Sequence, residues 1–473
     1  MKQGMALALL LAAITARADE AADYTVRLTV SPAAEPSPAM RYPLLPELRD
    51  TSPGNAVFLY YRCFAPEWLS HRRPEVAKQL DRWRDDTSKK PSENLKWVLK
   101  YRPLQEMDRA ARRSYCDWEM TERVRTEGIA MLLPDVQVMR EYANLLALRA
   151  RFQMEAGEHD KVLSTLQTGM TLARHVADAP TLIQSLVGNA ISAIMLGEVE
   201  RWIQTPGAPN LYWSLSNLPT PFIDMRKPLQ GERLFLDALF PGIREAIRDR
   251  KPEAFPLERL QRLAREMKFL ATPMIEDQGL PGVGGKFGMA LYAAKVYPDA
   301  RQSLRSRGWT EKGLDELPVT TAALMAEMIN YDRIYDNLVK WAGVPYPQAR
   351  AGIARAVKDL KPIEEDARLG TVLARLLLPA VDKVISAGVR ADRRIAMLRC
   401  VEALRLHAAA HAGGLPEKLS DVTEVPVPLD PRTGKPFEYQ RRGDTAVLYG
   451  PPFEGERSIP WQTSIKYKIT LKN

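Results

Sequence analysis

The chain has 473 residues, of which 45% are hydrophobic and 26% are charged, and its formal net charge is +9. These proportions are those of a globular protein, so they exclude a chain that is disordered or membrane-embedded throughout. The length predicts either two to three domains or one elongated repeat array. The Lys and Arg residues are scattered among Asp and Glu without a dense basic run, which argues against a nucleic-acid partner.

Residues 1–18 have the pattern of a secretory signal peptide. Lys2 precedes the apolar run MALALLLAAITA, and a small-x-small cleavage site ends at Ala18. We expect cleavage before Asp19 and export to the periplasm or the exterior, with an uncleaved anchor as the alternative. Removing the two positive residues of the signal would lower the net charge from +9 to +7. The mature chain is not expected to span a membrane, because the apolar stretch 182–196 is interrupted by polar residues.

The start of the mature chain, residues 19–56, is expected to form one strand followed by an arm. The segment YTVRLTV at 24–30 alternates apolar and polar residues, as a half-buried strand does. Residues 32–53 are rich in proline, which fixes φ and removes backbone donors, so they predict an extended arm that lies on the body of the protein.

Residues 57–411 have a dominant helical period and predict a mainly α fold built as a helical array. The clearest helical hairpin has its turn near Gly157, and Asp160 is a candidate cap of its second helix. This hairpin resembles a divergent tetratricopeptide repeat, although Arg149 and Gln153 occupy positions that the motif usually makes apolar. Further helices are expected at 181–203, 256–270, 318–342 and 364–411.

Residues 412–473 predict a loop and a small antiparallel β module. PFEY and TAVLY flank QRRGD as a hairpin, in which the Arg-Gly-Asp tripeptide serves as the turn, and SIKYKITL alternates as a third strand. We expect YTVRLTV to pair with this module, because two lone edge strands would otherwise be exposed. The alternative is that YTVRLTV docks on a helix.

Several strings are similar to those of a large family of uncharacterised exported bacterial helical proteins: CDWEM, PTLIQSLVGNAI, APNLYWSL and KWAGVPYPQAR. That resemblance covers most of the mature chain and implies no activity. The run from LRLHAAAHAGGLPEKL through LDPRTGKPFEYQRRGD to VLYGPP resembles the C-terminal part of the major pseudopilin of type II secretion. This second resemblance implies a small helix-plus-sheet module reused as a cap, without the pseudopilin's N-terminal assembly helix.

Three aromatic residues are candidate anchors for a ligand or partner. Tyr212 and Trp213 lie between two prolines, and Trp118 has a carboxylate on each side, as in some glycosidase clefts. The alternative is that Tyr212 and Trp213 fill a seam between helices. The two carboxylates beside Trp118 would face different ways on a helix, which argues against catalysis there.

The other motifs favour structural roles. His407 and His411 have i, i+4 spacing, but no third metal ligand is evident, so we interpret them as core-edge or helix C-terminal histidines and expect no metal or cofactor. The glycine-rich segment 279–288 fails the phosphate-loop patterns. Cys63, Cys116 and Cys400 are interpreted as small buried hydrophobes, with a Cys63–Cys116 disulfide as the alternative.

These features favour a non-enzymatic interaction or scaffold protein of the periplasm or cell envelope. Its partner would be another envelope protein or an anionic surface. The alternative is a hydrolase that acts on cell-wall or polysaccharide material. A deep pocket with clustered carboxylates would favour the hydrolase.

Overall fold

The computed structural model describes residues 25–65, 69–85, 90–127, 134–252, 286–358, 369–454, 459 and 463–472. These residues are mainly helical with a small mixed β-sheet, which confirms the predicted fold class at that level. The expected cleavage between Ala18 and Asp19 lies outside the described residues. So do the expected helix at 256–270 and most of the glycine-rich segment.

The chain forms two compact units. The described residues of the larger unit fall within Ala21–Trp118, Leu132–Pro228 and Val384–Asn473, and those of the smaller unit fall within Glu119–Met131 and Leu229–Lys383. The helices of the larger unit are α2 (Val57–Arg62), α3 (Pro74–Asp85), α4 (Arg102–Ala110), α6 (Pro134–Glu155), α7 (His159–Ala177), α8 (Leu182–Trp202), α9 (Tyr212–Ser216) and the last part of α17 (Leu369–Ala410). Short 3-10 helices lie at Leu48–Asp50, Ser70–Arg72, Glu93–Lys100 and Leu419–Asp421.

The predicted helical hairpin is present as α6 and α7. Gly157 adopts φ +69° in the turn, a left-handed conformation that glycine adopts without the Cβ clash of other residues. Helix α7 begins at His159 with Glu158 at its N-cap, so Asp160 lies in the first turn and not at the cap position where we placed it.

Helix α8 packs on α6 and α7 and is buried within the larger unit. It is the one helix of the described residues with the length and apolar content to cross a bilayer, and 67% of its apolar window is buried in the protein. At Gly188 a Cβ would come within 2.6 Å of the Ala173 carbonyl oxygen, so glycine permits the close approach of α8 to α7. The prediction of a buried helix at this position is confirmed.

The smaller unit is built around two long helices, α13 (Lys286–Arg305) and α15 (Val319–Val339), that pack against each other. Ala293, Val296 and Ala323 form a buried apolar cluster. Gly352 of α16 (Tyr346–Lys358) lies against the indole of Trp341. A Cβ at this position would come within 2.1 Å of the ring, so only glycine permits this close approach. The helices of this unit are α5 (Met120–Glu127), most of α10 (Arg226–Leu239), α11 (Ile243–Asp249), α13 (Lys286–Arg305), α14 (Glu311–Glu316), α15 (Val319–Val339), α16 (Tyr346–Lys358) and the first part of α17.

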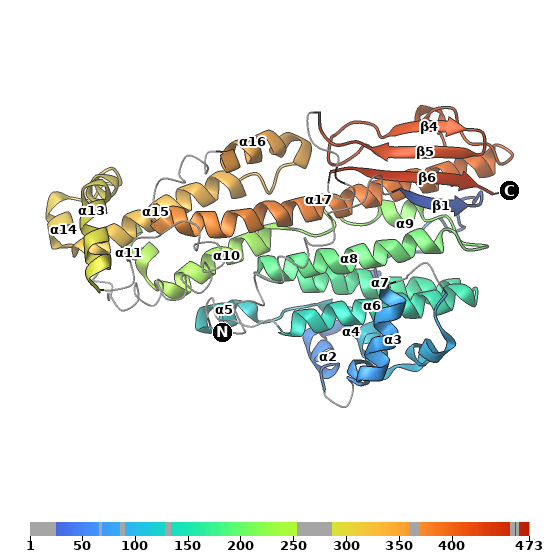
Figure 1. Ribbon diagram of the computed structural model, residues 1–473, viewed down its shortest axis with the longest axis horizontal. Coiled ribbons are helices and arrows are strands. Elements are labelled where there is room, and N and C mark those ends of the chain that lie inside the picture. Colours follow the sequence, from blue (N-terminus) through green and yellow to red (C-terminus); the bar gives the residue numbers. More distant parts are fainter. Residues whose placement is uncertain are drawn as a thin grey trace. The chain divides into compact units, whose positions relative to one another are not determined.

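The four-stranded sheet has the order β1-β6-β5-β4 (Figure 1). β4 (Glu438–Arg442), β5 (Thr445–Gly450) and β6 (Ile465–Leu471) form the expected antiparallel arrangement, with Gly443 in the hairpin turn. β1 (Val26–Val30) adds parallel to β6, with Val26 opposite Tyr467 and Val30 opposite Leu471. The predicted pairing of the two chain ends is therefore confirmed, and β1 does not dock on a helix instead.

A second, two-stranded sheet was not predicted. β2 (Ser52–Asn55) and β3 (Arg113–Tyr115) pair in parallel within the larger unit. The sequence of β2, SPGN, contains a proline and a glycine, both of which are depleted in strands. Within the described residues of 57–411, β3 is thus a strand that the helical period did not indicate.

The proline-rich arm lies on the larger unit, as expected. Leu44 is fully buried, and the ring of Tyr42 meets that of Trp202 edge to face at 6.4 Å. The Pro43 carbonyl accepts a hydrogen bond from the Gln167 side chain at 2.8 Å. The arm therefore carries the chain from the sheet across α7 and α8 to the start of the helical region.

Candidate functional site

Trp118 packs inside the larger unit. Its indole stacks on the ring of Tyr60 with 5.6 Å between centroids and 8° between planes. Its Nε1–H donates to the His175 carbonyl at 2.7 Å. The side chain of Asn55 holds the preceding residue, Asp117, through its backbone N–H and carbonyl, each at 2.9 Å. Trp118 thus joins α2 to α7 and is only 6% exposed.

The partner of this aromatic pair is a neutral histidine. His175 Nδ1 lies 2.9 Å from the Tyr60 hydroxyl. Burial lowers the pKa of the His175 imidazole to about 4, and the neighbouring Arg174 adds to this shift. The fold therefore favours the uncharged ring.

We expect this histidine to make the larger unit sensitive to acid. Because its folded pKa lies below the usual 6.5, its contribution to stability is complete above about pH 6.5 and is lost as the pH falls toward 4, by up to roughly 3 kcal/mol. Urea denaturation between pH 7 and 4 should show this loss. In a His175→Gln variant, which cannot titrate but can still bond Tyr60, the loss over this pH range should be smaller by that amount. An unchanged pH dependence in the variant would contradict the assignment.

Tyr212 and Trp213 lie at the start of α9 with their rings edge to face. Tyr212 is buried, and its hydroxyl donates to the Pro426 carbonyl. Trp213 is half-buried, and its Nε1–H donates to Glu35 of the arm at 2.7 Å. The two residues therefore connect α9 to the arm and to the loop before β4, and they do not converge with Trp118 on one site.

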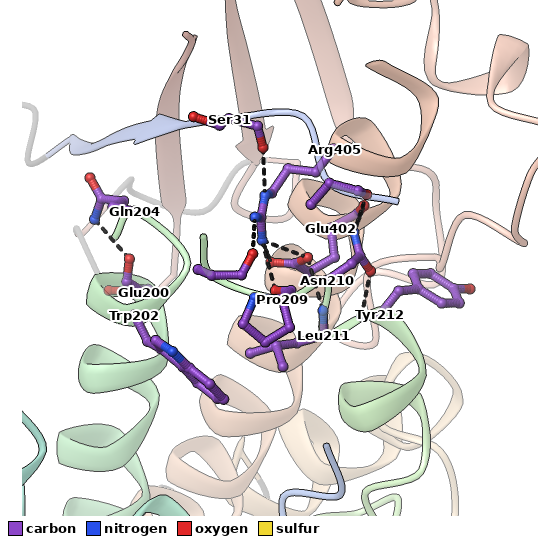
Figure 2. A network of polar contacts seen from close by, with 12 residues as sticks. Ser31, Glu200, Trp202, Gln204, Pro209, Asn210, Leu211, Tyr212, Glu402 and Arg405 are labelled. Carbon is purple, nitrogen blue, oxygen red and sulfur yellow. Dashed lines mark hydrogen bonds and ion pairs between the residues drawn. The ribbon is translucent and has the colours of Figure 1, made fainter. Parts of the chain in front are cut away.

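Next to Tyr212 lies a buried charged network (Figure 2). The Arg405 guanidinium, 2% exposed, donates to both carboxylate oxygens of Glu402 at 2.9 and 3.0 Å and to the carbonyls of Ser31, Ala208 and Pro209. Glu402 also accepts from the Leu211 backbone N–H at 3.0 Å. Burial raises the pKa of the Glu402 carboxyl, whereas Arg405 lowers it. The network fastens the strand-to-arm junction and the α8–α9 connection to α17, which is a structural role.

Two other buried carboxylates of the described larger unit also have arginine partners. Glu198 binds Arg151 at 2.7 Å, and Asp430 binds Arg393 at 2.7 Å. Each pair is less than 10% exposed. Carboxylates held in this way are positioned for stability, because a buried charge without a partner is costly.

Three aromatic residues at and beside α2 are partly exposed to solvent. On α2, Val57 and Tyr60 face the core, whereas Phe58 is 65% exposed and Tyr61 is 38% exposed. Tyr115 of β3, 55% exposed, lies beside the start of this helix, because its carbonyl accepts from the Ala56 N–H at 2.9 Å. We call Phe58, Tyr61 and Tyr115 the α2 surface. The sequence analysis did not predict this surface. The string VFLYYR could have indicated it, because it places apolar or aromatic residues on both sides of a helix.

The smaller unit has a cavity of about 260 Å³ between α13 and α15. Its charged lining residues include Asp299 and Glu327 but also Arg307 and Arg333. The lining is therefore of mixed charge and does not form the cluster of carboxylates that a hydrolase was expected to show.

The cysteines and the two histidines at the end of α17 are further candidate reactive side chains. All three cysteines are free and buried, so there is no Cys63–Cys116 disulfide. Burial raises the pKa of the Cys63 thiol to about 12, which disfavours the reactive thiolate. His407 is buried and His411 is exposed at the end of α17, and Glu424 lies beside both of them, a third potential ligand that the sequence spacing did not reveal.

Comparison of the chain with the models of known protein families, with curated proteins and with solved structures finds no match in any of the three.

Proposed function

We propose that the chain is a non-enzymatic interaction or scaffold protein of the periplasm or cell envelope that binds another envelope protein through the α2 surface. The observation that carries this proposal is the outward aromatic face of α2. A short surface helix normally buries its apolar stripe and exposes polar residues. Here Phe58 and Tyr61 add aromatic area on the exposed side as well.

Exposed aromatic residues are the usual anchors of protein interfaces. Tyrosine and phenylalanine bring a large contact area with few rotatable bonds, and clustered apolar exposure on a folded protein commonly marks a binding surface. The positive net charge of the chain favours a partner with acidic residues around the contact. The expected export signal supports a partner in the envelope.

The alternative function, a hydrolase of wall or polysaccharide material, requires two carboxylates that flank a substrate. In the larger unit the buried Glu198, Glu402 and Asp430 are each paired with an arginine, and the cavity between α13 and α15 has mixed charge. These observations favour the binding role.

We also propose that α6, α7 and α8 belong to a divergent tetratricopeptide-like array. Each of these helices packs against the other two, and the α6–α7 turn is short. The order of the end of α17, a loop and the β4–β6 strands supports the proposed relationship to the pseudopilin module. Both proposals concern architecture, and neither implies pilus assembly.

The test is loss of partner binding when the α2 surface becomes polar. The full chain would be used to capture its partner from envelope extract, and the affinity for that partner would then be measured. A Phe58→Ser/Tyr61→Ser double variant should bind at least about tenfold more weakly, because aromatic anchors commonly contribute 1 to 2 kcal/mol each.

Leu429→Ser is the matched control. Leu429 is 55% exposed and belongs to the same unit but not to the α2 surface. This variant should bind as the unmodified chain does. Equal affinity of all three proteins would refute the role of the α2 surface, and an equal loss in both variants would show a nonspecific effect of reduced apolar exposure.

A further inference from the structure

The C-terminal end of α17 and the residue that follows it bring two imidazoles together. His407 and His411 are four residues apart, and their rings stack with 3.9 Å between centroids and 17° between planes. After the helix the chain reverses through Ala412 and Gly413, which adopt φ +49° and +82°. The loop that follows returns Glu424 to the end of the helix.

The Glu424 carboxylate meets both rings through the same oxygen. Its Oε1 lies 3.2 Å from His407 Nδ1 and 3.2 Å from His411 Nδ1. Ligand atoms bound to one tetrahedral metal ion at about 2.0 to 2.2 Å lie roughly 3.3 to 3.6 Å from one another. The two distances from Glu424 Oε1 are thus close to this spacing, and all three donor atoms lie within 4.8 Å of one another.

The remaining contacts orient the carboxylate. Glu424 Oε2 accepts from the Thr423 backbone N–H at 3.0 Å and lies 3.3 Å from His407 Nδ1. His411 Nδ1 also lies 2.9 Å from the His407 carbonyl oxygen. An ion would take the place of these contacts at the Nδ1 atoms, while the bond from Thr423 would continue to hold the carboxylate.

We propose that His407, His411 and Glu424 form a binding site for a divalent transition-metal ion of the zinc type. Two imidazole nitrogens and one carboxylate oxygen suit Zn²⁺, Co²⁺, Ni²⁺ or Cu²⁺, whereas Ca²⁺ and Mg²⁺ prefer sites built from oxygen atoms alone. The His411 side chain is 52% exposed and that of Glu424 is 21% exposed, so the ion has a path from solvent. Three protein ligands leave a fourth position for water.

Metal binding at this site would connect α17 to the loop that leads to the sheet. Such an ion would bind the folded chain more tightly than the unfolded chain, because the chain reversal brings Glu424 to the two histidines, and it would therefore stabilise the folded state by mass action. The site is separate from the α2 surface and does not depend on the proposed partner.

The test is calorimetric titration of the untagged full chain, freed of metal by a chelator, with Zn²⁺ and separately with Ca²⁺. We expect one Zn²⁺ per chain and no comparable binding of Ca²⁺. His411→Ala and Glu424→Gln should each weaken Zn²⁺ binding by at least about tenfold. Glu417→Gln is the matched control, because Glu417 is an exposed carboxylate of the same loop that pairs with Arg441, and it should leave binding unchanged.

A second measurement identifies the ligands. X-ray absorption of the Zn²⁺-loaded chain should show two imidazole ligands, and that of His411→Ala should show one. The exposure of His411 makes this variant a mild structural change, and circular dichroism would verify its fold. Absence of stoichiometric Zn²⁺ binding, or equal affinity of the chain and both site variants, would overturn the proposal.

Discussion

Replacing Arg405 by alanine is expected to lower the free energy of unfolding of the larger unit by about 3 to 5 kcal/mol. The substitution removes the partner of a fully buried carboxylate, Glu402, and leaves an uncompensated charge in the interior. It also removes the donors to three backbone carbonyls, among them those of Ser31 and Pro209. Urea denaturation followed by tryptophan fluorescence would measure the loss.

Arg441→Ala provides the control for this experiment. Arg441 forms an ion pair with Glu417 at 2.7 Å, but Glu417 is 77% exposed, and surface pairs of this kind contribute about 0 to 1 kcal/mol. A loss at Arg405 no larger than the loss at Arg441 would show that the network of Figure 2 is not needed for stability.

Leu28→Ala is expected to destabilise the sheet and the arm by about 2 to 5 kcal/mol. Leu28 is 1% exposed and lies opposite Ile469 in the β1–β6 pair, so alanine would leave a cavity on the buried face of the sheet. Hydrogen exchange should show faster exchange of the amides of β1, because the strand would open more often.

The neighbouring substitution, Thr29→Ala, tests the same strand on its other face. Thr29 is exposed, so losing its side chain should change stability by no more than about 0.5 kcal/mol. Equal amide exchange rates of β1 in the Leu28→Ala and Thr29→Ala variants would contradict this prediction. They would show that packing of the buried face of β1 does not stabilise its pairing with β6.

The sheet and the helical hairpin were predictable because their patterns are local. The alternation of YTVRLTV and SIKYKITL marked one buried face on each strand, and Gly157 marked a turn between two apolar stripes. The parallel direction of β1 was not predictable, because period-two alternation is the same for either direction. β2 and β3 lacked the alternation altogether.

The candidate site residues were harder to predict, because they depend on which side chains the fold exposes and on which residues the loops bring back beside a helix. Trp118 and Tyr212 were chosen for their aromatic character, and the structure buries both. Phe58 resembles any core residue in the sequence, and only the packing of α2 shows that it faces outward. Glu424 lies 13 residues after His411, and no spacing rule places it beside a helix that has already ended.

The pairing of β1 with β6 has a consequence for synthesis. Val26 and its neighbour Tyr467 lie 441 positions apart, so β1 has no strand to pair with until β6 has been synthesised. Contacts of such long sequence separation form late and slowly. Loss of β6 by truncation would therefore leave β1 unpaired, at the opposite end of the sequence. Chains whose translation stops before β6 should be identifiable by proteolysis, because their N-terminal segment would be cleaved more readily.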